Sequence, residues 1–361
     1  MQPVKPQKEK LNLPSLDGWR ALSIALVLLE HASRTMWFPT AFIPFVQHGG
    51  LGVRFFFVIS GFLITWLLLK ENEFTGSVNL RNFYLRRALR IFPIYFLYLF
   101  VLSSLTSFSQ SSYAWVANLT FTTDFYQEAR ATTHFWSLGV EEQFYLVWPV
   151  ILFLVLRFAS VRILAITLTI PLVAAPIARF LVWASHPQYL DFLFQGYSYF
   201  CNFDVLAYGC IAAVIFHRRP NVLKLIFEKG GLVAFLSGIL LILIPIFIGR
   251  RHWIPSRLGE MVFISIQAIG FVFLLLHSVM CPQWPTYRFL NWNWVRHLGL
   301  LSYSTYIWQQ MFWSSESVFG VKNAWWTVFP IWILIALLVA HVSYYLLERP
   351  LLGLRAKFRV A

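Results

Sequence analysis

Long apolar runs alternate with short polar segments over the whole length of the chain. A helix that crosses the hydrocarbon core of a bilayer needs about 20 mostly apolar residues. On that measure the sequence predicts about ten transmembrane helices, near 16–36, 50–70, 90–108, 136–156, 161–183, 200–216, 231–249, 258–279, 297–314 and 325–347. The expected fold is an all-α polytopic membrane protein, and the even number of spans puts both termini on one side.

The distribution of positive charge predicts which side that is. Most of the 29 Lys and Arg residues lie in the N-terminal segment and in alternate loops on the same side of the predicted spans. Loops of this kind face the cytoplasm, so we predict two cytoplasmic termini, with residues 1–15 as a polar tail. Arg250, Arg251 and Arg257 cluster on the opposite side, where they either bind an acidic group, the interpretation we favour, or indicate that a span has been miscounted.

The composition agrees with a membrane location. Hydrophobic residues make up 58% of the chain and charged residues 12%, a balance that no soluble core of this length requires. The net charge of +14 is explained by cytoplasmic loops, so we expect membrane lipid and no nucleic acid as a partner. Cys201, Cys210 and Cys281 have no metal-ligand spacing and are expected to be packing residues. We therefore expect one membrane domain over residues 1–361, with no fused soluble domain, no metal and no permanently bound cofactor.

The first predicted span carries an arginine and a histidine on one face. Arg20 and His31 lie in the segment LDGWRALSIALVLLEHASR with ten residues between them. Eleven residues make about three helical turns, so the two side chains share a stripe and lie about 16 Å apart along the axis. Asp17 is placed one turn before Arg20 and can pair with it. An intramembrane histidine is as often a packing residue as a functional one, so spacing alone leaves both interpretations of His31 open.

A second basic feature begins the third predicted span. The stretch RNFYLRRALR contains Arg86, Arg87 and Arg90 at its cytoplasmic end. Arg87 and Arg90 are one helical turn apart, a spacing that suits two planar guanidinium groups gripping phosphate. Taken alone, the stretch fits an anchor to anionic lipid headgroups better than a ligand site.

Two carboxylates enter the fourth predicted span in HFWSLGVEEQFYLVWP. Glu141 and Glu142 follow each other there, and adjacent residues on a helix point about 100° apart, so at most one of them faces a given site. We favour Glu142 as the residue that orients His31 or balances its charge. An interfacial carboxylate exposed to water is an equally good interpretation.

These segments together resemble the acyltransferase-3 family of integral membrane O-acyltransferases. The similar segments run in order from LDGWRALSIALVLLEH through GVRFFFVISGFLIT, RRALRIFPIYF, HFWSLGVEEQFY and LSYSTYIWQQ to LLERPLL. The resemblance implies that Arg20 and His31 form the functional signature of the family, and that Arg87 and Arg90 are its basic pair. The chain departs from many relatives at Arg54, where they have an acidic residue, and at Gln309, where they have histidine. We assign no catalytic role to Gln309.

The resemblance implies an enzyme that transfers an acyl group, acetyl in most relatives, from cytoplasmic acyl-CoA to a sugar hydroxyl. Expected acceptors are O-antigen, exopolysaccharide or a glycosylated small molecule, in the bacterial inner membrane. We expect Arg20, Arg86, Arg87 and Arg90 to hold the CoA phosphates, His31 to act as base or acyl carrier, and Glu142 to stabilise its imidazolium form. The alternative is a transporter or flippase of a lipid-linked glycan, which an inverted repeat would favour; the sequence shows none.

Overall fold

The computed structural model describes residues 13–105, 110–126, 130–185, 199–251, 256–314, 318–321, 324–354 and 358, and every regular element in these ranges is a helix. The first half contains α1 (Leu16–Ala32), η1 (Thr40–Phe42), α2 (Ile43–Val46), α3 (Gly49–Thr75), α4 (Leu80–Leu105), α5 (Ser112–Leu119), η2 (Arg130–Thr132), α6 (Phe135–Phe158) and α7 (Val161–Ser185). Residues 1–12 of the predicted tail and the side chains of Arg250, Arg251 and Arg257 lie outside the described part.

The second half is also helical. It contains α9 (Tyr199–Arg218), α10 (Pro220–Lys224), η5 (Leu225–Lys229), α11 (Gly231–Arg251), α12 (Ser256–Met280), α13 (Pro285–Arg288), η6 (Phe289–Asn291) and α14 (Asn293–Trp313). The last described elements are η7 (Trp325–Thr327), α16 (Ile331–Ser343), the π-helical turn η8 (Tyr344–Glu348) and α17 (Arg349–Leu354).

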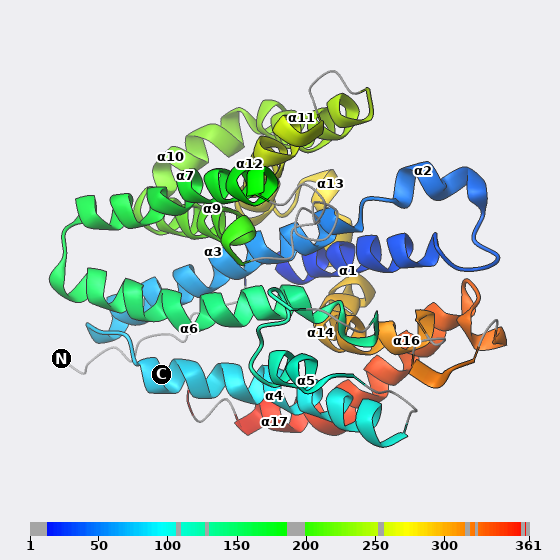
Figure 1. The fold of residues 1–361 in the computed structure, drawn as a ribbon. Coiled ribbons are helices and arrows are strands. Elements are labelled where there is room, and N and C mark those ends of the chain that lie inside the picture. Colours follow the sequence, from blue (N-terminus) through cyan, green and yellow to red (C-terminus); the bar gives the residue numbers. More distant parts are fainter. Residues whose placement is uncertain are drawn as a thin grey trace.

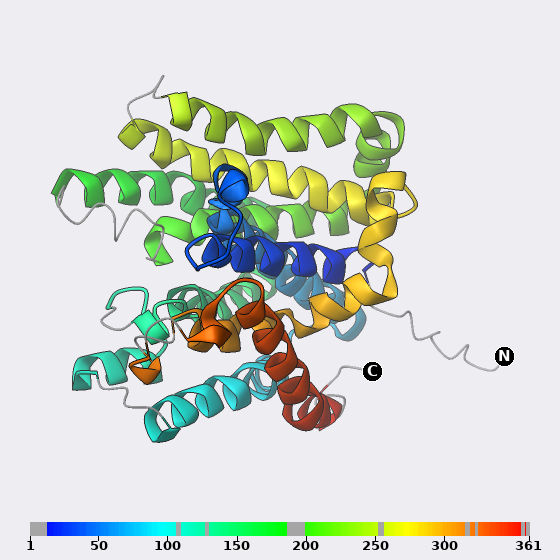
Figure 2. The same ribbon diagram turned by 90° about the vertical axis from the view of Figure 1, so that its right-hand side faces the viewer.

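The long helices run side by side as one bundle, with α1 and α3 in its middle (Figure 1). α3 packs along α9 and α1, α1 packs against α14, and α14 packs against α16. α11 lies against α12, and α7 lies against α9, so these helices form the opposite part of the bundle. The same order, from α11 and α12 past α1 to α16, is visible after a quarter turn (Figure 2).

Within the described residues, seven helical stretches are long and apolar enough to cross a membrane. They are Thr40–Thr75, Phe135–Phe158, Arg162–Leu181, Phe200–Arg218, Gly231–Gly249, Met261–Met280 and Ile331–Leu354. These stretches make the chain a multi-pass membrane protein and confirm the all-α class. The other three predicted spans also fall on helices, α1, α4 and α14, but they do not meet this criterion. α1 has only 17 residues, and α4 and α14 carry several charged or amide side chains.

Small residues allow α1 to lie very close to its two neighbours. A Cβ atom on Gly299 of α14 would collide with the backbone carbonyl of Asp17, and one on Gly52 of α3 would collide with that of Ser23. Only glycine permits such an approach between helix backbones. The close packing fixes the depth and rotation of α1, the helix that carries Arg20 and His31.

Candidate active site

A cavity lies inside the bundle between α1, α3, α4, α6 and α14. Its empty volume, including the open solvent at its mouth, is about 760 Å³. Most of its wall is apolar, with the polar groups concentrated at a few positions. The apolar side chains are those of Val53, Phe56, Phe57, Leu63, Ile64, Ile91 and Leu138.

Three of the predicted arginines line this cavity together. Arg20 comes from the first turns of α1, and Arg87 and Arg90 come from α4. Arg20 pairs with Asp17 at 3.1 Å, which confirms the pairing predicted from the sequence. The only acidic side chain among the described lining residues is Glu141, so the cavity has an excess of positive charge. Such a site favours an anion, and guanidinium groups favour phosphate in particular.

Arg87 is buried without a hydrogen-bonding partner among the described residues. Its side chain lies over the rings of Phe83 and Tyr145, with the guanidinium carbon 5.7 Å and 5.0 Å from the ring centroids. Ring faces attract a cation but satisfy none of its five N–H donors. Because a buried guanidinium without hydrogen bonds is costly, the arrangement indicates a ligand that supplies acceptors.

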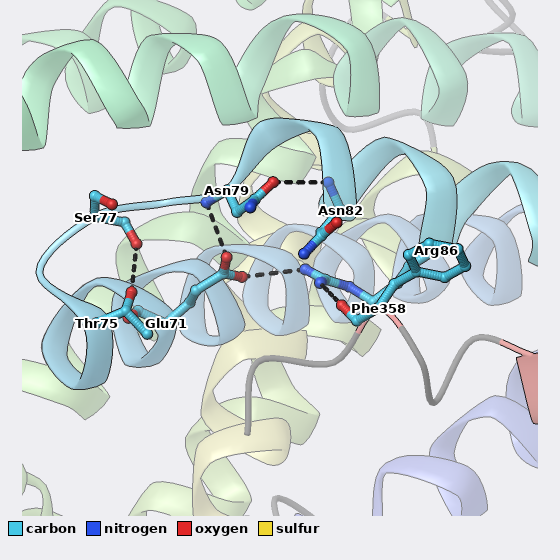
Figure 3. A network of polar contacts seen from close by, with 7 residues as sticks. All are labelled: Glu71, Thr75, Ser77, Asn79, Asn82, Arg86 and Phe358. Carbon is cyan, nitrogen blue, oxygen red and sulfur yellow. Dashed lines mark hydrogen bonds and ion pairs between the residues drawn. The ribbon is translucent and has the colours of Figure 1, made fainter.

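The structure separates Arg86 from the other three arginines. Arg86 pairs with Glu71 at 3.1 Å and donates to the backbone carbonyl of Phe358 at 2.6 Å (Figure 3). Glu71 also accepts from the backbone N–H of Asn79, at the turn between α3 and α4. Arg86 does not line the cavity and instead joins the ends of three segments of the chain. Its contacts are those of a structural residue, unlike those predicted for it.

Glu141, and not Glu142, lies on the cavity wall. Glu141 accepts from the hydroxyl of Ser60 at 2.7 Å, and that hydroxyl in turn accepts from Tyr145 at 3.0 Å. Glu142 is close enough to Arg87 to interact with it electrostatically, and it makes no hydrogen bond or ion pair with His31 among the described residues. The expectation that Glu142 orients His31 is therefore not met, because its helix directs it toward α4.

The ring of His31 is held by two residues of α14. Its Nδ1–H donates to the side-chain oxygen Oε1 of Gln309 at 2.7 Å, in the orientation that the amide has here. The ring stacks on Trp313, with centroids 4.6 Å apart and planes 23° from parallel. Because Nδ1 carries the proton in this arrangement, the lone pair of the neutral ring is on Nε2. His31 is therefore oriented as a base or a nucleophile.

The cavity reaches the level of Tyr306 but does not include His31 among its lining residues. The hydroxyl of Tyr306 donates to the backbone carbonyl of His134 at 2.8 Å and lies 2.6 Å from the hydroxyl of Ser137. Tyr306 and Gln309 are three residues apart on α14, or about one helical turn. The described lining of the cavity thus ends near Tyr306, about one turn of α14 from the partner of His31, whereas the sequence predicted an open passage from the arginines to His31.

Three polar residues at or near the site were not predicted from the sequence. Gln309 holds the ring of His31, and Tyr306, also on α14, lines the cavity. Glu348, in the π-helical turn η8, is 5% exposed, accepts from Ser304 and is close enough to Arg90 to interact with it electrostatically. The signal in the sequence that could have identified Gln309 is a polar residue on the face of α14 that points into the bundle. Gln309 was set aside because it departs from the pattern of the resembling family, although an amide can form the same hydrogen bond as a second histidine.

The fold and this cavity define a multi-pass helical protein with a cationic site inside its membrane domain. The family model described as "Acyltransferase domain" matches residues 13–348, and the chain belongs to this family, acyltransferase-3. That finding confirms the resemblance seen in the sequence.

The chain is also similar to curated proteins of Staphylococcus aureus. It is 28% identical over 381 residues to "Putative O-acetyltransferase SACOL0978" of strain COL, covering 95% of this chain and 58% of that protein. It is 28% identical over 368 residues to "O-acetyltransferase OatA" of strain NCTC 8325 / PS 47, covering 94% of this chain and 57% of that protein. The chain thus spans less than two thirds of the length of these relatives. No solved structure matches it.

Proposed function

We propose that the chain is a membrane O-acyltransferase that moves an acyl group, acetyl in the first instance, from cytoplasmic acyl-CoA to a hydroxyl of a sugar-containing acceptor. The observation that carries the proposal is the position of Arg20, Arg87 and Arg90 in one cavity that ends one helical turn below the partner of His31. Family membership and the names of the curated relatives support the reaction class.

The arginines hold the phosphates of acyl-CoA at the cytoplasmic mouth. Arg87 has unused donors, and Arg20 keeps donors beyond the one directed at Asp17. The apolar walls formed by residues such as Phe57 and Ile64 accommodate the pantetheine arm and the acyl chain. Glu142 balances part of the arginine charge, and Arg86 takes no part in binding.

His31 performs the transfer from its Nε2 atom. In direct transfer, Nε2 takes the proton of the acceptor hydroxyl while the oxygen forms a bond to the acyl carbon. The bond between acyl carbon and sulfur then breaks, and the CoA thiolate receives the proton. In a relay, Nε2 first attacks the acyl carbon itself and passes the acyl group to the hydroxyl afterwards. The hydrogen bond to Gln309 leaves Nε2 available for either route.

Acyl-CoA reaches His31 when the ring of Tyr306 moves. Two hydrogen bonds hold that ring, each worth about 1 kcal/mol net, so a thioester arriving from below can displace it. In the resting position the ring keeps water and acyl-CoA from the base, which limits hydrolysis in the absence of the acceptor.

The proposed topology has ten spans with both ends on the cytoplasmic side of a bacterial inner membrane. α1, α4 and α14 count as spans because several of the charged and amide groups that they carry point into the bundle rather than toward lipid. Arg20, Arg87 and Gln309 are examples: the first two line the cavity and the third is fully buried. Charged groups in membrane helices are tolerated in that position.

The test uses membranes from cells that produce the protein, supplied with radiolabelled acetyl-CoA. We expect label in the surface glycan or in glycosylated metabolites, with release of free CoA, and its loss in His31→Ala. His341→Ala is the matched control, because His341 is an exposed histidine of α16. Transfer that survives His31→Ala contradicts the proposal, and binding without release of CoA supports the transporter alternative.

A further inference from the structure

A single carboxylate stands in the wall of the cationic cavity. Glu141 of α6 is the only acidic side chain among the described lining residues, which also include Arg20, Arg87 and Arg90. It is close enough to Arg87 and Arg90 to interact with them electrostatically, but it forms no ion pair with either of them in the described part of the chain. A carboxylate repels phosphate, so the wall beside Glu141 suits a different portion of the ligand from the one that the arginines bind.

Hydroxyl groups from two helices fix the position of this carboxylate. Ser60 of α3 donates to its Oε1 atom at 2.7 Å, and the hydroxyl of Tyr145, about one turn further along α6, donates to Ser60 at 3.0 Å. The ring of Tyr145 also lies under the guanidinium group of Arg87, at 5.0 Å. All four side chains line the cavity, so together they form one continuous and well-ordered piece of its wall.

Glu141 keeps acceptor sites that the chain does not use. An ionised carboxylate has two oxygens and accepts about four hydrogen bonds. Ser60 supplies one of them, and the one hydroxyl hydrogen of Tyr145 is directed at Ser60. Within the described residues no hydrogen bond reaches Oε2 of Glu141. A carboxylate inside a membrane domain needs donors, so this position favours a ligand that brings an N–H or O–H group.

Acyl-CoA carries such donors between its phosphates and its thioester. The phosphates and the thioester offer only acceptors, and the amino group of adenine lies on the side of the phosphates away from the thioester. The pantetheine arm joins phosphate to sulfur, and it contains amide N–H groups. When the phosphates lie on Arg87 and Arg90, the arm passes along the same cavity wall as Glu141.

We propose that Glu141 accepts a hydrogen bond from an amide N–H of the pantetheine arm and so selects pantetheine thioesters as acyl donors. This inference rests on the proposed function. The arginines recognise the phosphates, and Glu141 recognises the arm and fixes how far the thioester enters the bundle. Because Glu141 contacts no reacting atom, the bond contributes to donor binding and not to the chemical step.

The decisive experiment compares two donors, acetyl-CoA and S-acetylpantetheine, of which the second keeps the arm but lacks the phosphates and adenosine. Glu141→Met removes the acceptor and keeps a side chain of similar length. We expect its kcat/KM to fall by about 10- to 100-fold with both donors, the effect of losing one hydrogen bond to a charged group. Arg87→Lys is expected to lower kcat/KM for acetyl-CoA alone. If Glu141 only balances the charge of the arginines, Glu141→Met leaves transfer from S-acetylpantetheine unchanged and the inference is wrong.

The control removes a glutamate at a position away from the cavity. Glu228 is an exposed residue of η5, so Glu228→Met is expected to leave kcat/KM unchanged for both donors. If the protein with Glu141 intact transfers no acetyl group from acetyl-CoA, the proposed function itself fails. If it transfers the group and Glu141→Met does so equally well, only the inference about Glu141 fails, so the two failures are distinguishable.

A change in the donor tests the same contact in the unaltered protein. Two analogues of acetyl-CoA each have one amide N–H of the arm replaced by an ester oxygen. We expect one of them to have a kcat/KM about 10- to 100-fold below that of acetyl-CoA, and this difference to disappear in Glu141→Met, where the bond is already absent. Equal values for both analogues and acetyl-CoA in the unaltered protein overturn the inference, even if Glu141→Met does not fold or S-acetylpantetheine is no substrate.

Discussion

Two buried arginines of the described chain are surrounded in opposite ways. Arg179 of α7 is 2% exposed and donates to the backbone carbonyls of Cys201 and Met261, to Ser265 and to Asp204, the last at 2.5 Å. Asp204 also accepts from Ser265. Arg87 of α4 is 9% exposed and has two aromatic rings but no hydrogen bond within the described residues.

The difference separates a structural arginine from one that is prepared for a ligand. The guanidinium of Arg179 is hydrogen-bonded to residues of α9 and α12, and Asp204 neutralises its charge. Arg179 therefore joins α7, α9 and α12 and requires no ligand. Around Arg87 the chain provides aromatic rings that attract the cation but no hydrogen-bond acceptor among the described residues. Arg87 also lines a cavity together with Arg20 and Arg90. Burial alone therefore does not identify a site, whereas unsatisfied donors on a cavity wall do.

The largest expected effect follows from removing Arg179 from its buried ion pair with Asp204. Arg179→Met leaves Asp204 as a buried carboxylate without its cation, which costs about 3–5 kcal/mol of stability. We expect a strong fall in the thermal midpoint of the detergent-solubilised protein, measured by nanodifferential scanning fluorimetry. The double variant Arg179→Met with Asp204→Leu is expected to recover most of the loss, because no lone charge remains. A single variant as stable as the original contradicts the structural role of this group.

Replacement of Arg87 is expected to affect binding rather than stability. Arg87→Lys keeps the charge but removes the planar fork that grips phosphate. Loss of a charged hydrogen bond of about 1.5–3 kcal/mol weakens CoA binding roughly 10- to 100-fold. Isothermal titration calorimetry with CoA measures this directly. Arg81→Lys, at an exposed arginine of the same helix, is the control and should leave the affinity unchanged.

The contrast between the two arginines also shows what the sequence could reveal. Arg20, Arg87 and Arg90 were predictable because helical spacing and a family resemblance both selected them. Arg86 and Glu142 were selected without support from the resemblance, from their places in a basic stretch and at the edge of a predicted span. Their contacts depend on how helices rotate against distant segments such as that of Phe358. The role of Gln309 required coordinates, because only they show that its oxygen and the ring of His31 meet across 278 residues of sequence.

Prediction of the fold had a similar limit. Apolar runs located the helices well, since all ten predicted spans fall on helices. Hydropathy identifies seven of them as membrane-crossing, and the three that it misses, α1, α4 and α14, carry the arginines, His31 and Gln309. α1 is missed because it has only 17 residues. In α4 and α14 the polar groups, several of which serve the internal site, lower the apolar character, so the sequence signal is weak where much of the chemistry is located.

A smaller effect is expected at the boundary between the cavity and His31. Tyr306→Phe removes the hydroxyl that bonds to His134 and Ser137 but keeps the ring. Loss of both bonds, about 1 kcal/mol each, increases the population of the displaced ring roughly 30-fold. We expect release of CoA into water, without acceptor, to rise by up to that factor in a thiol-detection assay. A lower rate would show that the hydroxyl assists the reaction instead of restraining access.

The smallest effect on CoA binding is expected at Arg86, although it adjoins Arg87 in the sequence. Arg86→Gln removes the ion pair with Glu71 and the bond to the carbonyl of Phe358, while Glu71 keeps its bond to the backbone of Asn79. The two side chains of the pair are only 14% and 7% exposed, so we expect a loss of stability of about 1–3 kcal/mol, a lower thermal midpoint and unchanged CoA affinity. Arg87→Gln in the same titration provides the comparison, since it removes a cavity donor from the adjacent position. A clear loss of CoA affinity in Arg86→Gln would place this residue in the ligand site and remove the distinction between satisfied and unsatisfied arginines on which the site assignment depends.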